Sequence, residues 1–480
     1  MSTGKVTTEL NLADYRELKS RYFSLTSGRK LPRGRLRAMI GAISAVSERD
    51  LVMGGYNSDE AHIVAFSEAI AIAEAIKDKG ELDNRLNSSI KEWMNSRTKA
   101  EPLWEDVTGT PEKGHLTRGC SFRAISLFSG AMGLDIGFMQ SGVNILLGND
   151  IEKESCNTVL SNLPDMRFLN KDIDDVTPAD LTREAGISSG ELDILIGGPP
   201  CQPFSPAGKR AGLNDPRASP LKYFIRAIKE IRPAAFVMEE VPGLLSSRLK
   251  HFPYYDKYTR KPVGDEERGS AFKVVTEMLD STGYRYAYAT LNAADYGAPQ
   301  FRNRVIFIGL KEGEPSFPEP THAGNGSSGR DPWVTFWEAA RSFRYTKDLG
   351  LAEGDARFMG YVPPGGNWSQ MPPEIAKKAM GKALESEGGR MGFFRRIAWD
   401  EPSPTLVTTP TQKGTFLVHP EFDRFLSIPE YKILQGFPEW WRITGTTESQ
   451  YKLIGNAVPI HLSMAVASHV TKILKGEPIQ

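Results

Sequence analysis

Cysteine is scarce in this chain, and its scarcity limits the chemistry that the sequence can support. Only Cys120, Cys156 and Cys201 are present among 480 residues. These three widely spaced thiols are odd in number and lack the paired spacing of zinc-binding cysteines, so the sequence predicts neither a disulfide framework nor a metal site. Each cysteine must therefore be judged singly, as a small buried apolar residue or as a reactive thiol.

Long apolar runs and an excess of charge of either sign are also missing. No stretch has the length of a membrane-spanning helix, and the first ten residues lack the pattern of a signal peptide. Basic and acidic residues both number 59, which gives a formal net charge of +0. We therefore expect a cytoplasmic protein with no membrane partner. Any nucleic-acid surface must come from local clusters of basic residues.

Residues 1–117 predict a helical extension without recognisable catalytic chemistry. Apolar residues recur there with helical spacing, for example at Leu36, Ile40 and Ile43, which is typical of a small helical core. A basic cluster that begins at Arg29 is more simply explained as a solvated face than as a phosphate-binding site. A stretch rich in proline, glycine and threonine then predicts a linker before the next domain.

An apolar strand pattern leads directly to Cys201. The run from Leu192 to Ile196 predicts a buried strand, and the Gly-Gly-Pro-Pro sequence after it ends that strand abruptly. Ligands of open α/β sheets bind at the carboxyl ends of the parallel strands. This position favours a nucleophilic thiol, whereas a lone cysteine in an arbitrary sequence is more often a buried apolar residue.

A second strand pattern runs into a glycine-rich turn, Phe128-Ser-Gly-Ala-Met-Gly133, and then into the start of a helix. Glycines let the backbone approach a cofactor closely, and the amino terminus of a helix adds a favourable dipole. The spacing is not the Gly-x-Gly-x-x-Gly pattern of dinucleotide-binding turns. The next strand pattern ends at Asp150, an acid that could bind a ribose diol or cap the following helix.

Together with three motifs nearer the carboxyl terminus, these features resemble the DNA cytosine-5 methyltransferase family. The resemblance rests on Gly-Gly-Pro-Pro-Cys-Gln-Pro-Phe-Ser around Cys201, Phe-Ser-Gly-x-x-Gly at 128–133, Glu-Glu-Val at 239–241, Gln-x-Arg-x-Arg at 300–304 and Ile-Gly-Asn-Ala-Val-Pro at 454–459. The motifs stand in the family's order and cover roughly residues 123–473. The chain departs from the family at Glu240, where the family normally has asparagine.

The resemblance implies an α/β fold. We expect a doubly wound, Rossmann-like, S-adenosylmethionine-dependent methyltransferase domain with an inserted target-recognition domain and a helical amino-terminal extension. The expected domains are the extension at 1–117, the catalytic domain at 118–310, the target-recognition domain at 311–394 and a return to the catalytic domain at 395–480.

The resemblance also implies roles for individual residues. Cys201 would attack cytosine carbon 6, Glu239 would contact ring N3, and Arg302 and Arg304 would complete the catalytic set, with Arg304 on the base oxygen. The residues expected to bind S-adenosylmethionine are Phe128, Gly130, Gly133, Asp150, Ile151, Asp172, Ile173, Pro200, Leu221, Asn456 and Val458. The expected DNA contacts are Ser205, Lys209, Arg210 and Gln300.

The predicted function is sequence-specific methylation of carbon 5 of a flipped-out cytosine in double-stranded DNA, through a covalent cysteine adduct. We expect a monomer of the restriction-modification type, with a cognate restriction endonuclease acting on the same site. Two alternatives stay open. An RNA cytosine-5 methyltransferase of the same fold would carry identical catalytic motifs. The other alternative is a methyltransferase that also acts as a DNA-binding regulator through its amino-terminal extension.

Overall fold

The computed structural model of the chain describes residues 121–200, 219–247, 269–324, 329–340, 351, 353–385 and 392–478. The expected helical extension of residues 1–117 lies outside the described residues. The described part divides into two compact units. The larger unit holds residues up to 349, 398–415 and 426 onward, and the smaller unit holds 350–397 and 416–425. The smaller unit thus begins later than the expected insertion at 311–394, and the boundaries of that insertion stay a prediction.

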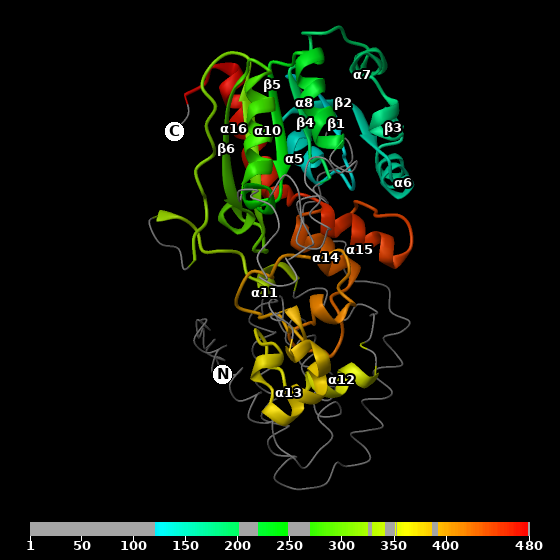
Figure 1. The fold of residues 1–480 in the computed structure, drawn as a ribbon, viewed down its shortest axis with the longest axis vertical. Coiled ribbons are helices and arrows are strands. Elements are labelled where there is room, and N and C mark those ends of the chain that lie inside the picture. The colour runs from blue at the N-terminus through cyan, green and yellow to red at the C-terminus, as the bar shows by residue number, and fades with distance from the viewer. Residues whose placement is uncertain are drawn as a thin grey trace, which may run out of the picture. The chain divides into compact units, whose positions relative to one another are not determined.

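A seven-stranded sheet organises the larger unit (Figure 1). In spatial order its strands are β3 (Phe168–Asn170), β2 (Val143–Asp150), β1 (Phe122–Leu127), β4 (Ile194–Gly197), β5 (Ala235–Glu240), β7 (Asn303–Leu310) and β6 (Arg285–Asn292). The strands from β3 to β5 are parallel, whereas β7 is antiparallel to both of its neighbours. The chain reverses its direction of progress across the sheet between β1 and β4, and open α/β sheets bind ligands at such a switch point.

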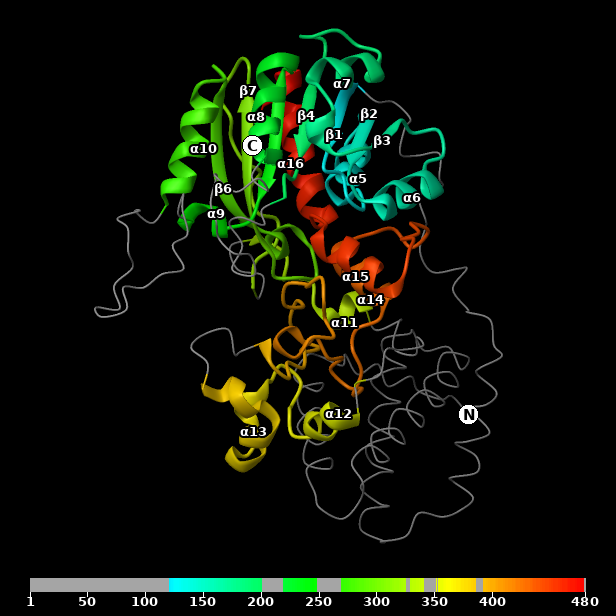
Figure 2. The same cartoon turned by 45° about the vertical axis from the view of Figure 1, so that its right-hand side comes forward.

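Helices cover both faces of this sheet (Figures 1 and 2). One face packs against α7 (Pro178–Ala185), α8 (Ser219–Ile231) and α10 (Ser270–Asp280), which share one apolar core with the strands. The other face carries α5 (Gly133–Gln140) and α16 (Ile460–Lys475). The remaining elements of this unit are η1 (Ile173–Asp175), α6 (Lys153–Asn162), α9 (Gly243–Ser246), η4 (Ala293–Tyr296), α11 (Phe336–Ala340), η10 (Lys413–Thr415), α14 (Ile428–Gln435) and α15 (Thr447–Asn456). This arrangement confirms the predicted doubly wound α/β fold.

The side chains of β5 point alternately to the two faces of the sheet. Phe236 and Met238 belong to the core shared with α8 and α10, and Val237 between them points to the α5 side because successive side chains alternate in a strand. All six residues of β5 are buried. The two glutamates at its end, Glu239 and Glu240, are therefore both withdrawn from water and face opposite sides of the sheet.

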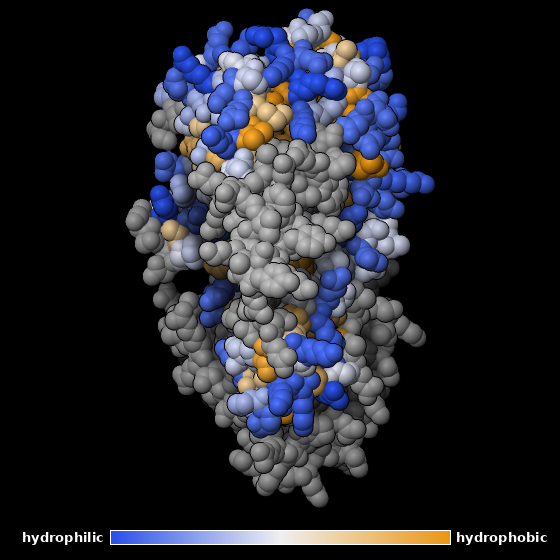
Figure 3. Space-filling model, viewed as in Figure 1, coloured by the Kyte–Doolittle hydropathy of each residue, from blue (hydrophilic) through white to orange (hydrophobic). Residues whose placement is uncertain are grey.

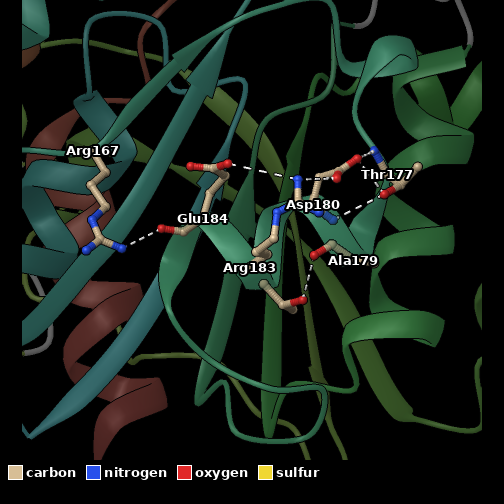
Figure 4. A network of polar contacts seen from close by, with 7 residues as sticks. Arg167, Thr177, Ala179, Asp180, Arg183 and Glu184 are labelled. Atoms are coloured by element: carbon tan, nitrogen blue, oxygen red, sulfur yellow. Dashed lines mark hydrogen bonds and ion pairs between the residues drawn. The ribbon is translucent and has the colours of Figure 1, made fainter.

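Helix α7 illustrates how local sequence sets the limits of an element (Figure 4). The Thr177 hydroxyl accepts a hydrogen bond from the Asp180 N–H, and the Asp180 carboxylate accepts one from the Thr177 N–H. Pro178 opens the helix, and Gly186 ends it in the left-handed conformation. Hydrogen bonds from Thr177 and then Arg183 hold the pKa of Asp180 at about 2.

One described stretch, Thr447–Lys475, has the length and apolar composition of a membrane-spanning helix. It comprises α15 and α16, and 72% of its most apolar window is buried inside the fold. Burial of this kind is typical of a core helix in a globular protein. On the visible described surface, hydrophilic residues predominate and apolar residues form small separate spots (Figure 3).

The smaller unit has an apolar core of its own. Its helices are α12 (Glu353–Met359) and α13 (Pro373–Met380), with the short turns η7 (Trp368–Gln370) and η8 (Gly381–Glu385). Met359, Phe394 and Phe416 lie at the centre of this core. The rings of Phe394 and Phe416 meet edge to face with their centroids 5.6 Å apart, a favourable aromatic geometry.

Arg396 ties together the loops of the smaller unit. Its side chain is 1% exposed, and its guanidinium donates hydrogen bonds to the carbonyls of Met359, Val362 and His419 and pairs with Asp423. A buried guanidinium is stable only when its donors find acceptors. Three stretches that are separate in the sequence are therefore fixed to one another by a single side chain.

Glycine is required where α5 crosses α16. A Cβ atom added to Gly137 would lie 2.5 Å from Ser463 Cβ and 2.7 Å from the Met464 backbone nitrogen. We expect Gly137→Ala to lower the free energy of unfolding by about 1 kcal/mol or more, because overpacking costs about 1–3 kcal/mol and outweighs the helix propensity of alanine. Denaturant unfolding measures the effect.

The matched control is Gly354→Ala in α12, where an added Cβ meets no atom within 4 Å. That variant should be as stable as the wild type or slightly more stable. Equal stability of the Gly137→Ala variant and the wild type would contradict the close approach of α5 and α16.

Candidate functional site

Four separate motifs of the sequence reach the same edge of the sheet. The parallel strands β1, β2, β4 and β5 end there at Leu127, Asp150, Gly197 and Glu240. Because β7 runs in the opposite direction, its first residues, including Arg304, stand at this edge as well. The topology thus collects polar residues from distant parts of the chain around the switch point.

The glycine-rich turn after β1 is joined to the end of β2 by Asp150. Phe128, Gly130 and Met132 all adopt positive φ angles, of 59°, 54° and 69°. The Gly130 N–H donates a 2.8 Å hydrogen bond to one carboxylate oxygen of Asp150, and the Glu152 N–H donates another of 2.8 Å to the second oxygen. Burial raises the pKa of Asp150 despite these two bonds. The acid therefore fixes the shape of the turn.

The residues beside Asp150 fit a nucleoside. Ile151 follows it directly and is 60% exposed, which is unusual for a large apolar side chain. A Cβ atom added to Gly130 would meet no atom within 4 Å, so the turn is open on that side. An acid suits ribose hydroxyls and an exposed apolar face suits a purine ring, so this corner can accept the nucleoside part of S-adenosylmethionine.

The other residues expected to bind the cofactor differ in their exposure and packing. A Cβ atom at Gly133 would lie 2.9 Å from Ala457 Cβ and 3.1 Å from the Val458 nitrogen, so the turn packs on the carboxyl-terminal motif. The remaining positions are as follows: Asp172 is exposed and caps η1, Ile173 is 4% exposed, Pro200 and Asn456 are exposed, and Val458 is 6% exposed. Leu221 differs from the expectation, because it is 1% exposed and packs in the main apolar core.

Glu239 and Arg304 form an ion pair whose side chains are 11% and 10% exposed. In the antiparallel register of β5 and β7, Glu239 stands opposite Ile306, and Arg304 is its diagonal neighbour on the same face. A Cβ atom at Gly198 would lie 2.8 Å from a carboxylate oxygen of Glu239. The carboxylate thus lies against the end of β4, three residues before Cys201 in the sequence.

Gln300 and Arg302 are buried among backbone groups of the returning carboxyl-terminal segments. Gln300 is 0% exposed, and it accepts a 2.9 Å hydrogen bond from the Leu406 N–H. Arg302 is 2% exposed and donates to the carbonyls of Leu406 and Gly455 at 3.0 and 2.7 Å. These contacts hold the returning carboxyl-terminal segments against the sheet. Both side chains are enclosed by backbone in this fold, and their roles toward DNA and the base stay predictions.

Glu240 is deeply buried at the end of β5, with 1% exposure. One of its carboxylate oxygens accepts a 3.3 Å hydrogen bond from the Val241 N–H, and the other has no hydrogen-bond partner among the described residues. Burial, and then the neighbouring charge of Glu239, raise the pKa of Glu240 well above its usual value, and Arg304 opposes this shift. A carboxyl in these surroundings favours its neutral form.

Four of the predicted site residues belong to a segment for which only the sequence motif is informative. Cys201, Ser205, Lys209 and Arg210 lie outside the described residues. Their roles as nucleophile and as DNA contacts stay predictions that rest on the sequence motifs.

Sequence reasoning missed Asp135, a fully buried acid in the first turn of α5. Burial raises its pKa to about 7, although the nearby hydroxyl groups of Ser126 and Ser129 work in the opposite direction. The only signal in the sequence was a single acid among the apolar residues that follow the glycine-rich turn. Such a residue also suits an ordinary helix start, so the pattern did not distinguish it.

The buried Asp135 should make stability depend on pH. Below about pH 4 the carboxyl is neutral in both states, whereas between pH 4 and 7 it ionises only when the chain unfolds. Its contribution to stability is therefore lost as pH rises toward 7, by on the order of 4 kcal/mol. We expect the stability of Asp135→Asn relative to wild type to grow between pH 4 and 7 and to stay constant above. Denaturant unfolding over a pH series measures this difference.

Asp165→Asn is the matched control, because Asp165 is an exposed acid of the same unit. Its stability difference from wild type should not follow this pattern. A pH-independent difference for Asp135→Asn would contradict the raised pKa.

Comparison with known proteins agrees with this geometry. Type II methyltransferase M.PspPI of Psychrobacter sp. is 33% identical over 372 residues, which cover 75% of this chain and 81% of the relative. Type II methyltransferase M.Eco47II of Escherichia coli is 32% identical over 368 residues, covering 74% of this chain and 79% of the relative. A crystal structure described as a prophage-encoded DNA modification methyltransferase of E. coli shares the fold, with a TM-score of 0.51 and 22% identity over 74% of this chain and all of that one.

The family comparison covers nearly all of the described residues of both units. The profile of the C-5 cytosine-specific DNA methylase family matches residues 122–472, from the first strand to the last helix. This span includes the glycine-rich turn, the Glu239–Arg304 pair and the carboxyl-terminal motif at 454–459. The chain therefore belongs to the C-5 cytosine-specific DNA methylase family and is a DNA (cytosine-5) methyltransferase.

Proposed function

We propose that this enzyme methylates carbon 5 of a flipped-out cytosine within a specific sequence of double-stranded DNA, through a covalent adduct with Cys201. The observation that carries the proposal is the Glu239–Arg304 ion pair set against Gly198 at the end of β4. Gly198 stands only three residues before Cys201, so a short tether links the thiol to the place where the carboxyl group lies. A nucleophile and an acid near one another are what this chemistry requires.

The thiol is needed because cytosine carbon 5 is a poor nucleophile. Addition of the Cys201 thiolate to carbon 6 forms an S–C bond and moves the electron pair of the 5,6 double bond toward carbon 5 and the ring. Bound S-adenosylmethionine supplies the electrophilic methyl group that carbon 5 then accepts. Loss of the carbon 5 proton to a base or water, followed by cleavage of the S–C bond, restores the double bond and the free thiolate.

Glu239 stabilises the charge that this addition creates. We assign its carboxyl group to ring N3 of the cytosine, where a hydrogen bond to N3 would stabilise the negative charge that develops in the ring. Arg304 orients the carboxyl through their ion pair, and we assign its guanidinium to the base oxygen. Both side chains are mostly buried, so little reorganisation is needed during the reaction. The cytosine reaches them only after it leaves the duplex, which costs a few kcal/mol.

Cofactor binding is assigned to the corner around Asp150. Its carboxylate would accept hydrogen bonds from the ribose hydroxyls, and the exposed Ile151 would contact the adenine ring. The turn at 128–133 would border the methionine part of the cofactor, because it stands at the switch point next to the end of β4.

Target recognition is assigned to the smaller unit. It is inserted between the motif at 300–304 and the motif at 454–459, and it has its own core. The relatives are named Type II methyltransferases, so we infer a restriction-modification role with a cognate endonuclease that acts on the same sequence. We propose that the enzyme acts as a monomer.

Methyl transfer tests the proposal directly. We expect purified protein to move a labelled methyl group from S-adenosylmethionine to duplex DNA and not to structured RNA, and bisulfite sequencing of DNA from an expressing host should show one protected sequence. Cys201→Ala should abolish transfer and also the covalent trapping of 5-fluorocytosine DNA on a denaturing gel.

Cys156→Ala is the control, because Cys156 is a partly buried thiol on α6 whose pKa is raised by burial. This variant should keep both activities. Transfer to RNA alone would support the RNA alternative, and an active Cys201→Ala variant would refute the adduct.

The acid has its own test. We expect Glu239→Gln to reduce the methyl-transfer rate by a factor of about 10² to 10⁴, the usual contribution of a positioned acid, while binding of S-adenosylmethionine changes little. Single-turnover kinetics and a binding titration separate the two effects. Glu230→Gln, which removes an exposed carboxylate on α8, should leave both unchanged. A mild effect of Glu239→Gln would point away from contact with N3.

A further inference from the structure

The chemistry described above assigns no role to the side chain of Glu240. Alternation along β5 puts it on the same face as Phe236 and Met238, which belong to the apolar core. Its neighbour across the register is Val305, another fully buried core residue. A carboxyl group enclosed in this way costs free energy, and nothing in the apolar core compensates for it.

Among the described residues, Arg304 is the cation that acts on the two adjacent acids. Glu239 on the same strand and Arg304 on β7 are the charged groups of the described residues that act on Glu240. The helices on this face, α8, α9 and α10, contribute apolar residues to the core, such as Phe224, Leu244 and Ala271. Arg304 is already paired with Glu239. Glu240 lies on the opposite face of β5, but the charges of Glu239 and Arg304 still act on it. Two adjacent buried carboxylates with one guanidinium near them cannot both be ionised without a large penalty.

We propose that Glu240 is a positioning residue that works as a neutral acid, leaving Arg304 to Glu239 alone and switching methyl transfer off when it loses its proton. The proposal rests on the proposed function of Glu239. The guanidinium of Arg304 holds the Glu239 carboxyl in place while Glu240 is uncharged. Ionisation of Glu240 adds a second buried negative charge that repels the Glu239 carboxylate and attracts the Arg304 guanidinium from the other face of β5, which weakens the geometry of the ion pair.

Glutamate at position 240, where the family normally has asparagine, gives this position a side chain that can lose a proton. Asparagine at 240 has no proton to lose in the range where the protein is folded. Glutamate at the same position makes the neighbouring ion pair respond to alkaline pH. The relevant variants are therefore Glu240→Gln, which keeps the length of the side chain, and Glu240→Asn, which restores the family residue.

A neutral, buried Glu240 also makes the stability of the folded protein depend on pH. An unfolded glutamate ionises near pH 4.3, whereas the pKa of folded Glu240 is raised well above its usual value. Its stabilising contribution is complete below the unfolded pKa and is lost as pH rises toward the folded pKa. The two uncharged variants should therefore gain melting temperature relative to the wild type as pH rises from 4, until the folded pKa is reached.

The test compares single-turnover methyl transfer over an alkaline pH series in the full-length wild type, Glu240→Gln, Glu240→Asn and the surface control Glu230→Gln. We expect the wild type and the control to lose about tenfold in rate per pH unit above the transition, as for loss of one proton. Both uncharged variants should keep the neutral-pH rate within about threefold of the wild type and should lack this transition. The same transition in Glu240→Gln and the wild type would overturn the proposal.

Melting temperatures measured without DNA or cofactor provide a readout that does not depend on activity. A variant-minus-wild-type difference that grows with pH supports a neutral Glu240, and a constant difference overturns it. If the wild type transfers no methyl group to any substrate, the proposed function fails, and the melting series still decides the protonation of Glu240.

Discussion

The reversed direction of β7 is the constraint on which the site depends. A sheet made only of parallel strands would place the start of β7 at the opposite edge from the end of β5, and Arg304 would be a full strand length away from Glu239. The antiparallel register instead brings the guanidinium into the diagonal position beside the carboxylate. Burial of both side chains then strengthens their attraction, because few water molecules screen it.

Side chains that bond to backbone hold the returning carboxyl-terminal segments in place. Gln300 and Arg302 reach the segment near Leu406 and the motif near Gly455. Gln435 on α14 donates to the carbonyls of Ile454 and Ala457 and meets Gln300. Loops that lack a regular ladder of hydrogen bonds must satisfy their carbonyls elsewhere, and these amide and guanidinium groups do so. The polar residues of the Gln-x-Arg-x-Arg motif thus divide their work between the scaffold and the ion pair with Glu239.

The family resemblance was sufficient to predict the fold class, and glycine, proline and apolar runs predicted where several strands end, because their effects are local. The resemblance also named Glu239, Arg304 and Asp150 as site residues, and the structure places all three at one edge of the sheet. The surroundings of Gln300 and Arg302 could not be predicted, because they are enclosed by residues more than a hundred positions later in the chain. Asp135 was missed for a related reason, since its burial depends on the packing of the whole unit.

The contact between α5 and α16 joins the beginning of the catalytic unit to its end. The Ser463 hydroxyl donates to the Leu134 carbonyl, and Gly137 permits the two helices to touch. During synthesis the first of these helices emerges more than three hundred residues before the second. The turn that precedes α5 is consequently only partly packed until α16 has been synthesised. Such an order of assembly makes this turn among the last parts of the enzyme to be completed, and it ties the appearance of activity to the arrival of the final helix.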